Sequence, residues 1–564
     1  MRASIVAERV WLAVCAGVAV AILGFYAGRL GMPLPIFAGD EGAYLIRALY
    51  TDDVVAKYPG VAFLTNGVHL SVIRAIYELG APVIVGDRLV NAAAYLGGLL
   101  LLWRTAAGRL PRTEQLALLL IAIGYPFYRF AFSNMAEGLF VGVLLLLCLA
   151  TGRWYRSRPF VHAVLGGALA AALVLIKPHG LVTVAALALV AAADAAASRH
   201  WRRLPVRVLL FAAAFFVVGN LIQIGADEPA AHPLAFFLDG LYDQQLAQQM
   251  PPNVLHLGLL AFGAMVSATA LLAGAPILVG LLDLLGRWRG AGRRFEAEGL
   301  DLVFLLLTVS LAGALAMAAV FSMKVAWTPS ETYRLWGRYF EFFVPTIWLA
   351  AGPALARRIG WRLAWTCAAV MLAGLGGLLL SLRAGIVLFP WDSDALLAFF
   401  QPDPVRAPLN LAIPYRAIAT GIAVLAAVAL ALRVRPIHVG LGLVLGLGAV
   451  SSHLDHVWVG GVVNERNALE RDIRSVLPRL PPQPADILLL TPDANIGHLV
   501  FLRLEARPRV FLGAVADAPV AAVATARAVL VSGPETPPAG PWERTFHGQE
   551  LSLYEPPRPP KPTR

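Results

Sequence analysis

The chain has 564 residues, of which 59% are hydrophobic and 14% are charged, and its mean hydropathy is +0.70. Soluble domains carry about 25% charged residues, so this composition excludes a soluble globular protein and predicts a polytopic membrane protein. The net charge of +11 does not indicate nucleic-acid binding, because arginines cluster at alternate ends of the apolar segments, as the positive-inside rule predicts.

The N-terminal segment, residues 1–9, is polar and leads into an apolar run without an evident cleavage site. We therefore expect a retained first span with a cytoplasmic N-terminus. Cys15, Cys148 and Cys367 all fall within predicted spans, so we expect no disulfide and no metal cluster.

Segment length and charge bias predict about 13 spans, an odd number that places the C-terminus outside. The predicted spans cover residues 11–30, 81–103, 116–129, 137–150, 161–176, 180–197, 208–224, 257–285, 302–323, 340–355, 363–382, 413–432 and 437–452. The fifth and sixth come from one long apolar stretch, which Lys177-Pro178-His179-Gly180 divides because Pro and Gly break helices. The first external loop covers about residues 31–80.

The tail differs in composition and predicts a small α/β domain over residues 457–555, outside the membrane domain of residues 1–456. Residues 464–476 look helical, and short apolar runs at 487–490, 510–512, 528–531 and 550–554 predict strands. Residues 556–564 are Pro-rich and predicted to be disordered. No glycine-rich nucleotide fingerprint is present.

Two adjacent carboxylates, Asp40 and Glu41, follow the first span directly and begin a short amphipathic segment that contains Tyr44. Charged groups at a membrane boundary are costly to desolvate and indicate function. The alternative is that they only cap a helix, since Asp and Glu stabilise its positive end.

This arrangement resembles the first external loop of the GT-C superfamily of membrane glycosyltransferases. The resemblance continues, over roughly the first 350 residues, in the segments 86–91, 133–140, 176–178 and 337–345. It implies an all-α polytopic membrane domain that uses a polyprenyl-phosphate sugar donor. Protein O-mannosyltransferases and lipid A aminoarabinose transferases are members, and the layout of the latter looks similar to this chain.

The resemblance implies that Asp40 is the catalytic base. Glu41 would orient Asp40, share a metal with it or act in its place, and Glu137 would be a second site carboxylate. The alternative for Glu137 is a structural ion pair with Arg129 or another buried cation.

Substrate-binding candidates lie at the ends of later spans and on the first loop. Lys177 and His179 flank the helix break, where Lys177 would bind the lipid phosphate or else reach the surface as a snorkelling lysine. Arg338 and Tyr339 open a span and suit a phosphate, although an interfacial anchor is the alternative. The weaker candidates are Lys57, Tyr58 and His69.

Two polar clusters invite a metal or nucleotide interpretation. His453, Asp455 and His456 form either a metal site or, more in keeping with their position, an interfacial polar cluster. Asp392-Ser393-Asp394 matches a short motif of nucleotide-sugar enzymes, but the topology places it outside, where nucleotide sugars are not expected. We assign no cofactor and leave a divalent metal open.

The sequence thus predicts an integral bacterial inner-membrane glycosyltransferase with its site and C-terminal domain in the periplasm. Its partners would be a polyprenyl-phosphate-linked sugar, a lipid, glycan or protein acceptor, and membrane lipids, with no nucleic acid. A lipid or sugar transporter is the rival from another class, although it would more often have repeated halves. A third interpretation is a non-catalytic envelope-assembly partner.

Overall fold

A computed structural model describes most of the chain: residues 2–31, 38–50, 67–108, 110–198, 203–225, 254–290, 299–324, 333–401, 413–482, 487–504, 508–512, 517–518, 520–532 and 540–557. The helices of its membrane part are α1 (Arg2–Leu30), α2 (Ala38–Leu49), α4 (Gly67–Glu78), α5 (Val83–Ala107), α6 (Arg112–Gly124), α7 (Tyr128–Ala131), α8 (Glu137–Trp154), α9 (Pro159–Ile176), α10 (Gly180–Ser198), α11 (Leu204–Gly225), α14 (Val254–Gly290), α15 (Leu300–Lys324), α16 (Phe343–Ala350), α17 (Gly352–Leu355), α18 (Trp361–Arg383), α19 (Tyr415–Ala431) and α20 (Pro436–Val476). Short 3₁₀ turns are η2 (Gly337–Tyr339), η3 (Leu396–Phe399) and η4 (Leu477–Arg479).

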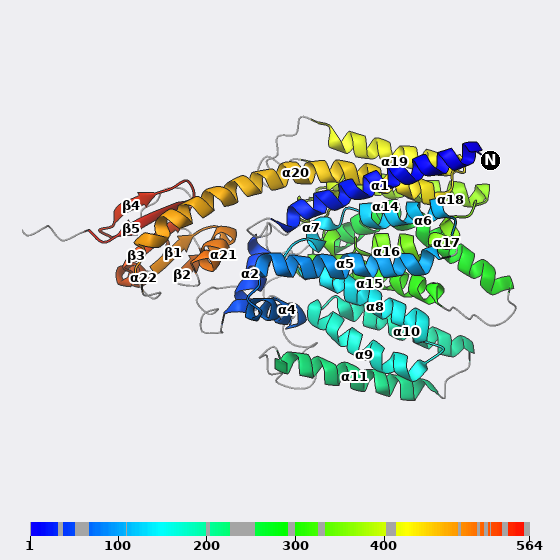
Figure 1. Cartoon of the computed structure of the whole chain (residues 1–564), viewed down its shortest axis with the longest axis horizontal. Helices are drawn as coiled ribbons and strands as arrows, with labels where there is room; N and C mark the ends of the chain where they lie inside the picture. Colours follow the sequence, from blue (N-terminus) through cyan, green and yellow to red (C-terminus); the bar gives the residue numbers. More distant parts are fainter. Residues whose placement is uncertain are drawn as a thin grey trace, which may run out of the picture.

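The long apolar helices pack side by side as one bundle (Figure 1). Within the described ranges, nine helices are long and apolar enough to cross a membrane, namely α1, α5, α8, α9, α11, α14, α15, α18 and α20. Two shorter apolar helices, α10 and α19, accompany them. Each predicted span coincides with at least one helix, which confirms the polytopic fold, while the count of 13 crossings stays a prediction.

The predicted break in the long apolar stretch is present. Helix α9 ends at Ile176, Lys177 is extended at its C-cap, and α10 begins at Gly180. A side chain at Gly180 would meet the backbone of Leu173 at 2.8 Å, so only glycine allows this close return of the chain. Two helices therefore replace one, and the polar residues between them lie at the bundle end nearest α4.

Helix α20 differs from its prediction, because the expected span 437–452 and the expected helix 464–476 are one helix of 41 residues. It leaves the bundle and continues alongside the C-terminal sheet (Figure 1). The division at about residue 456 stays a prediction, and α20 runs through that point without a break.

The C-terminal sheet has the order β2-β1-β3-β5-β4. Its strands are β1 (Ile487–Thr491), β2 (Arg509–Leu512), β3 (Ala528–Ser532), β4 (Glu543–His547) and β5 (Leu551–Glu555), with helices α21 (Ala494–Arg503) and α22 (Val520–Thr525). Strand β1 pairs in parallel with β2 and β3, whereas β5 is antiparallel to β3 and β4. The four predicted strands are confirmed, and β4 is additional. We call these strands with α21 and α22 the sheet domain.

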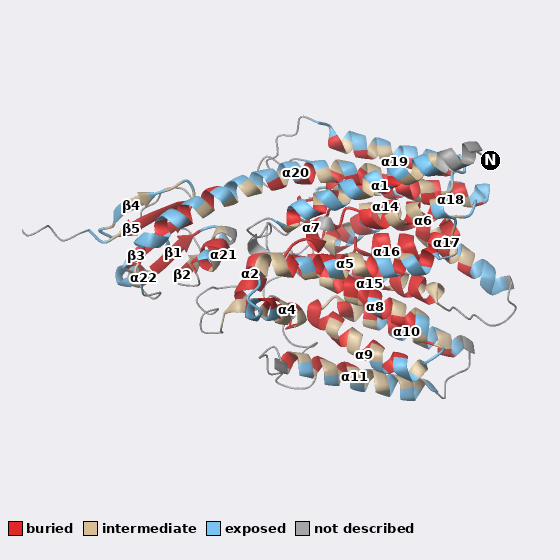
Figure 2. Ribbon diagram, in the orientation of Figure 1, coloured by how far each residue is buried: buried red, intermediate tan, exposed pale blue. Residues whose placement is uncertain are grey.

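Burial is concentrated along the middle of the bundle and in the centre of the sheet domain (Figure 2). Helices α2 and α4 lie at the bundle end that faces the sheet domain, while α1 begins at the opposite end (Figure 1). Side chains of α2 contribute both to the bundle core and to the core that α20 and α21 share. The Asp40-Glu41 segment therefore lies where the two parts of the molecule meet.

Candidate active site

Asp40 lies in the first turn of α2 and forms an ion pair with Arg338 of η2. Nη1 of Arg338 donates to Oδ2 of Asp40 over 2.7 Å. The Asp40 side chain is 50% exposed, whereas that of Arg338 is 11% exposed. The carboxylate is thus open to solvent on one side and held by a nearly buried cation on the other.

Tyr339 connects this pair to the break between α9 and α10. Nη2 of Arg338 donates weakly to the Tyr339 hydroxyl at 3.4 Å. The His179 ring lies 4.3 Å from the Tyr339 ring, and Nζ of Lys177 lies 5.6 Å from the same ring centre. Tyr339 also stacks on Trp336 at 5.5 Å, which fixes the plane of its ring.

Lys177 forms an ion pair with Glu137, the first residue of α8. Nζ of Lys177 lies 2.5 Å from Oε1 of Glu137, and their side chains are 10% and 1% exposed. The partner of Glu137 is therefore Lys177 and not Arg129, and Lys177 does not extend to the surface. The structure thus brings together six of the predicted residues: Asp40, Glu137, Lys177, His179, Arg338 and Tyr339.

The charges and the burial of this cluster shift the pKa values of Asp40 and Lys177. Burial raises the pKa of Asp40, but the charge and hydrogen bond of Arg338, with further positive charge from Arg334 and Lys177, bring it below the ordinary value. Burial lowers the pKa of Lys177, even though Glu137 opposes this change. Asp40 is consequently ionised at neutral pH, as a proton acceptor must be.

Several polar atoms of the cluster remain unused. Among the described residues, Nε of Arg338, Nδ1 of His179 and Oε2 of Glu137 are buried and have no hydrogen-bond partner. Buried polar atoms without partners are costly in a folded protein unless a ligand satisfies them. An unused guanidinium N–H beside a lysine suits an anionic oxygen, such as one of a phosphate.

Glu41 has a different environment from its neighbour. It is fully buried, it accepts a hydrogen bond from the backbone N–H of Asn134 at 3.2 Å, and it lies 3.7 Å from a guanidinium nitrogen of Arg88. Asn134 in turn donates to Asp87 at 3.1 Å. Adjacent residues on a helix point in different directions, and here only Asp40 reaches the cation cluster.

His69 belongs to this second network and not to the Asp40–Arg338 pair. Its Nε2 lies 3.1 Å from Oδ1 of Asp87, and its ring packs against Tyr44. Asp87, Arg88 and Asn134 were noticed in the sequence only as parts of family-like segments, with no role assigned. Lys57 and Tyr58 lie outside the described residues.

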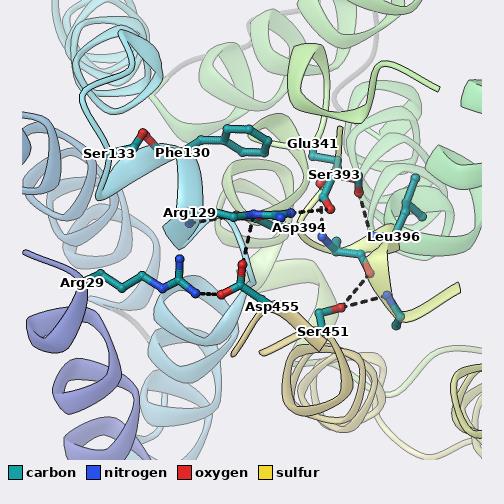
Figure 3. A network of polar contacts seen from close by, with 12 residues as sticks. Arg29, Arg129, Phe130, Ser133, Glu341, Ser393, Asp394, Leu396, Ser451 and Asp455 are labelled. Carbon is teal, nitrogen blue, oxygen red and sulfur yellow. Dashed lines mark hydrogen bonds and ion pairs between the residues drawn. The ribbon is translucent and has the colours of Figure 1, made fainter. Parts of the chain in front are cut away.

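A third polar network joins helices that are remote in sequence (Figure 3). Arg129 donates through Nε to Asp394 at 2.5 Å and lies 3.3 Å from Asp455, which also pairs with Arg29. Asp392 pairs with Arg334, and its carbonyl oxygen accepts the backbone N–H of Arg338 at 2.7 Å. Asp392 thus supports the site through Arg334 and the backbone of Arg338, whereas Asp394 belongs to the network around Arg129.

The histidines around Asp455 do not join it in a metal site. The His453 ring stacks on Tyr415 at 5.7 Å, and Asp455 is buried between two arginines. In the part of the chain that the structure describes, no group of three His, Cys, Asp or Glu side chains could hold a metal ion.

Comparison with known proteins places the fold. No protein-family model matches the chain, and no curated protein does. The structure of ArnT from Cupriavidus metallidurans in the apo state is similar over 97% of this chain and 98% of that one, with 17% identity and a TM-score of 0.53. The archaeal oligosaccharyltransferase AglB from Archaeoglobus fulgidus, in complex with an inhibitory peptide and a dolichol-phosphate, aligns over 92% of this chain and 69% of its own at 12% identity and a TM-score of 0.40. The chain therefore has the fold of ArnT.

Proposed function

We propose that the protein is a membrane glycosyltransferase that transfers a sugar from a polyprenyl-phosphate donor to an acceptor hydroxyl at the periplasmic face of the bacterial inner membrane. The observation that carries the proposal is the cluster at the end of the bundle, where the half-exposed carboxylate of Asp40 pairs with Arg338, and where Arg338 and Lys177 both lie against the ring of Tyr339. A base beside cations is what this chemistry requires. The ArnT-like fold supports the same reaction class.

The reaction uses the two sides of the cluster differently. Asp40 accepts the proton of the acceptor hydroxyl as its oxygen forms a bond with the anomeric carbon of the sugar. The bond between that carbon and the phosphate oxygen breaks, and the polyprenyl phosphate leaves with the electron pair. Arg338, Lys177 and His179 offer N–H groups to the negative charge that develops on the phosphate. Attack opposite the leaving group inverts the anomeric centre.

Arg338 can serve both halves of the reaction. Its Nη1 already holds Asp40, while its buried Nε has no partner among the described residues and is available to a donor oxygen. One planar guanidinium would then set the distance between base and donor, and a rigid fork does this better than a lysine. Glu41, in the neighbouring buried network, holds α2 in place without entering the reaction.

The test is a transfer assay on detergent-solubilised protein with a panel of radiolabelled polyprenyl-phosphate sugars. Wild type should transfer or hydrolyse one donor, and Asp40→Asn should abolish this without loss of folded protein. Asp301→Asn is the matched control, because Asp301 forms a comparable 2.7 Å ion pair with Arg287 elsewhere.

Near-normal turnover by Asp40→Asn would refute Asp40 as the base. Movement of the donor across liposomes without a covalent product would favour a transporter instead.

A further inference from the structure

Helix α2 has two buried faces. Tyr44, Leu45 and Ala48 pack into the core of the bundle. Gly42, Ile46 and Tyr50, spaced four residues apart and therefore on one side of the helix, meet the sheet domain and α20 instead. The helix that carries Asp40 is thus held between two parts of the molecule.

The contact at Gly42 is the closest of these. A Cβ atom placed on Gly42 would lie 2.7 Å from the Cβ of His498 in α21, which is shorter than real Cβ contacts. Cβ atoms are fixed to the backbone, so rotation of the histidine ring cannot relieve this overlap. Any side chain at residue 42 must therefore move α2 relative to α21.

Two further contacts extend this interface along α2. Ile46 is fully buried in a cluster with Leu469 and Ile473 of α20 and with side chains of α21. The Tyr50 ring meets Phe501 edge-on at 5.9 Å. Apolar burial of this kind stabilises a contact by about 25 cal/mol per Å² of area removed from water, so the interface favours one defined position of α2.

The sheet domain is itself tied to the bundle through α20. Near its C-terminal end, α20 accepts hydrogen bonds at Asp472 from the backbone N–H groups of Glu550 (2.6 Å) and Leu551 (3.1 Å). Further back, Asp455 of the same helix lies 3.3 Å from Arg129 inside the bundle. One continuous helix therefore links the position of the sheet domain to that of the membrane helices.

We infer that the sheet domain positions the catalytic base: the contact of His498 with Gly42 sets where α2 lies and hence the distance from Asp40 to Arg338. This inference rests on the proposed function, because it assigns Asp40 the role of base. His498 and Gly42 are positioning residues and touch no substrate.

The first test compares Gly42→Ala, His498→Gly and the double variant by steady-state kinetics. A displacement of about 1 Å at a reacting group can cost up to about a hundredfold in rate, so Gly42→Ala should lower kcat at least about tenfold while the donor KM stays unchanged. In the double variant the alanine is at residue 42 and the glycine is at residue 498, so the overlap is relieved and kcat should return to that of His498→Gly alone. Gly97→Ala in α5 is the matched control, since nothing lies within 4 Å of its added Cβ.

A wild-type-like kcat for folded Gly42→Ala, or a loss that His498→Gly does not reverse, would overturn the inference. A second measurement works even when wild type transfers no donor, the outcome that would refute the proposed function. Asp40→Cys is labelled with an impermeant maleimide, and the native cysteines are buried. Adding Gly42→Ala should change the labelling rate, and adding His498→Gly as well should reverse the change. Equal rates in all three proteins would exclude a positioning role.

Discussion

The pH dependence of transfer should change when Arg338 loses its charge in Arg338→Gln. In the native protein the charge and hydrogen bond of Arg338 lower the pKa of Asp40 against the effect of burial, which raises it. Asp40 must be ionised to accept a proton, so activity falls as the pH drops through this pKa. Without Arg338 the pKa of Asp40 rises, and the acid limb of the profile therefore moves to higher pH.

The size of the change follows from the exposure of the pair. Asp40 is 50% exposed, and ion pairs with a solvated partner contribute about 0.2–1 kcal/mol. Arg338 is only 11% exposed and donates a charge-assisted hydrogen bond, which favours the upper end of that range. Because one pH unit corresponds to about 1.36 kcal/mol, the acid limb should rise by about 0.5–0.7 unit.

The assay measures kcat/KM from about pH 2.5 to about pH 8, because this ratio reports ionisations of the free enzyme and the pKa of Asp40 lies below the ordinary aspartate value of about 3.9. The donor KM should rise as well, but that change shifts the whole profile without altering its shape. Arg357→Gln is the control, because it breaks a 2.8 Å ion pair with Asp283 outside the site. An acid limb that superimposes on that of wild type would refute the coupling between Arg338 and Asp40.

Three other outcomes are expected. Lys177→Met should raise the donor KM about tenfold, which is the effect of losing one charged hydrogen bond. Adding Glu137→Gln removes the charge that Lys177 had neutralised, so it should recover stability but not donor binding. Glu41→Gln should mainly lower the free energy of unfolding and should change kcat little, because Glu41 lies in a buried network away from the cations. Denaturant titration measures the first effect and the transfer assay measures the second. Arg129→Met should cost about 3–5 kcal/mol of stability in the same unfolding measurement, because it removes the partner of the buried Asp394 carboxylate. Arg287 is exposed, so Arg287→Met should cost less than about 1 kcal/mol.

Most of the membrane fold could be predicted because hydrophobic length and charge bias act locally along the chain. The break at Lys177 is an example, since Pro178 and Gly180 interrupt a helix whatever surrounds them. The continuity of α20 could not be predicted in this way. Its apolar character ends partway, but backbone hydrogen bonding does not depend on lipid, and no proline follows Pro436 within it. Strand β4 was missed because Glu543, Arg544 and His547 leave it mostly exposed.

The sequence could identify individual residues of the candidate site, but it could not predict which of them form ion pairs with one another. A charged side chain within or beside an apolar segment can be recognised in the sequence as a candidate site residue, as Glu137 and Lys177 can. The pairs form across long separations: Asp40 and Arg338 are 298 positions apart, and Arg129 and Asp394 are 265 apart. No local pattern encodes such contacts, so Arg129 was considered as a partner for Glu137.

The ion-pair chain from Arg29 through Asp455 to Arg129 also has a consequence for biogenesis (Figure 3). Arg29 lies in the last turn of α1, the first in chain order of the described helices that could cross a membrane, whereas Asp455 belongs to α20, the last of them. At about 5–20 residues per second, Arg29 waits roughly tens of seconds for this carboxylate after it leaves the ribosome. Until α20 is made, Arg29 and Arg129 lack the Asp455 carboxylate, although Arg129 can already pair with Asp394. This ion-pair chain can therefore be completed only after α20 has been made, and it then ties the first of the described membrane helices to the last.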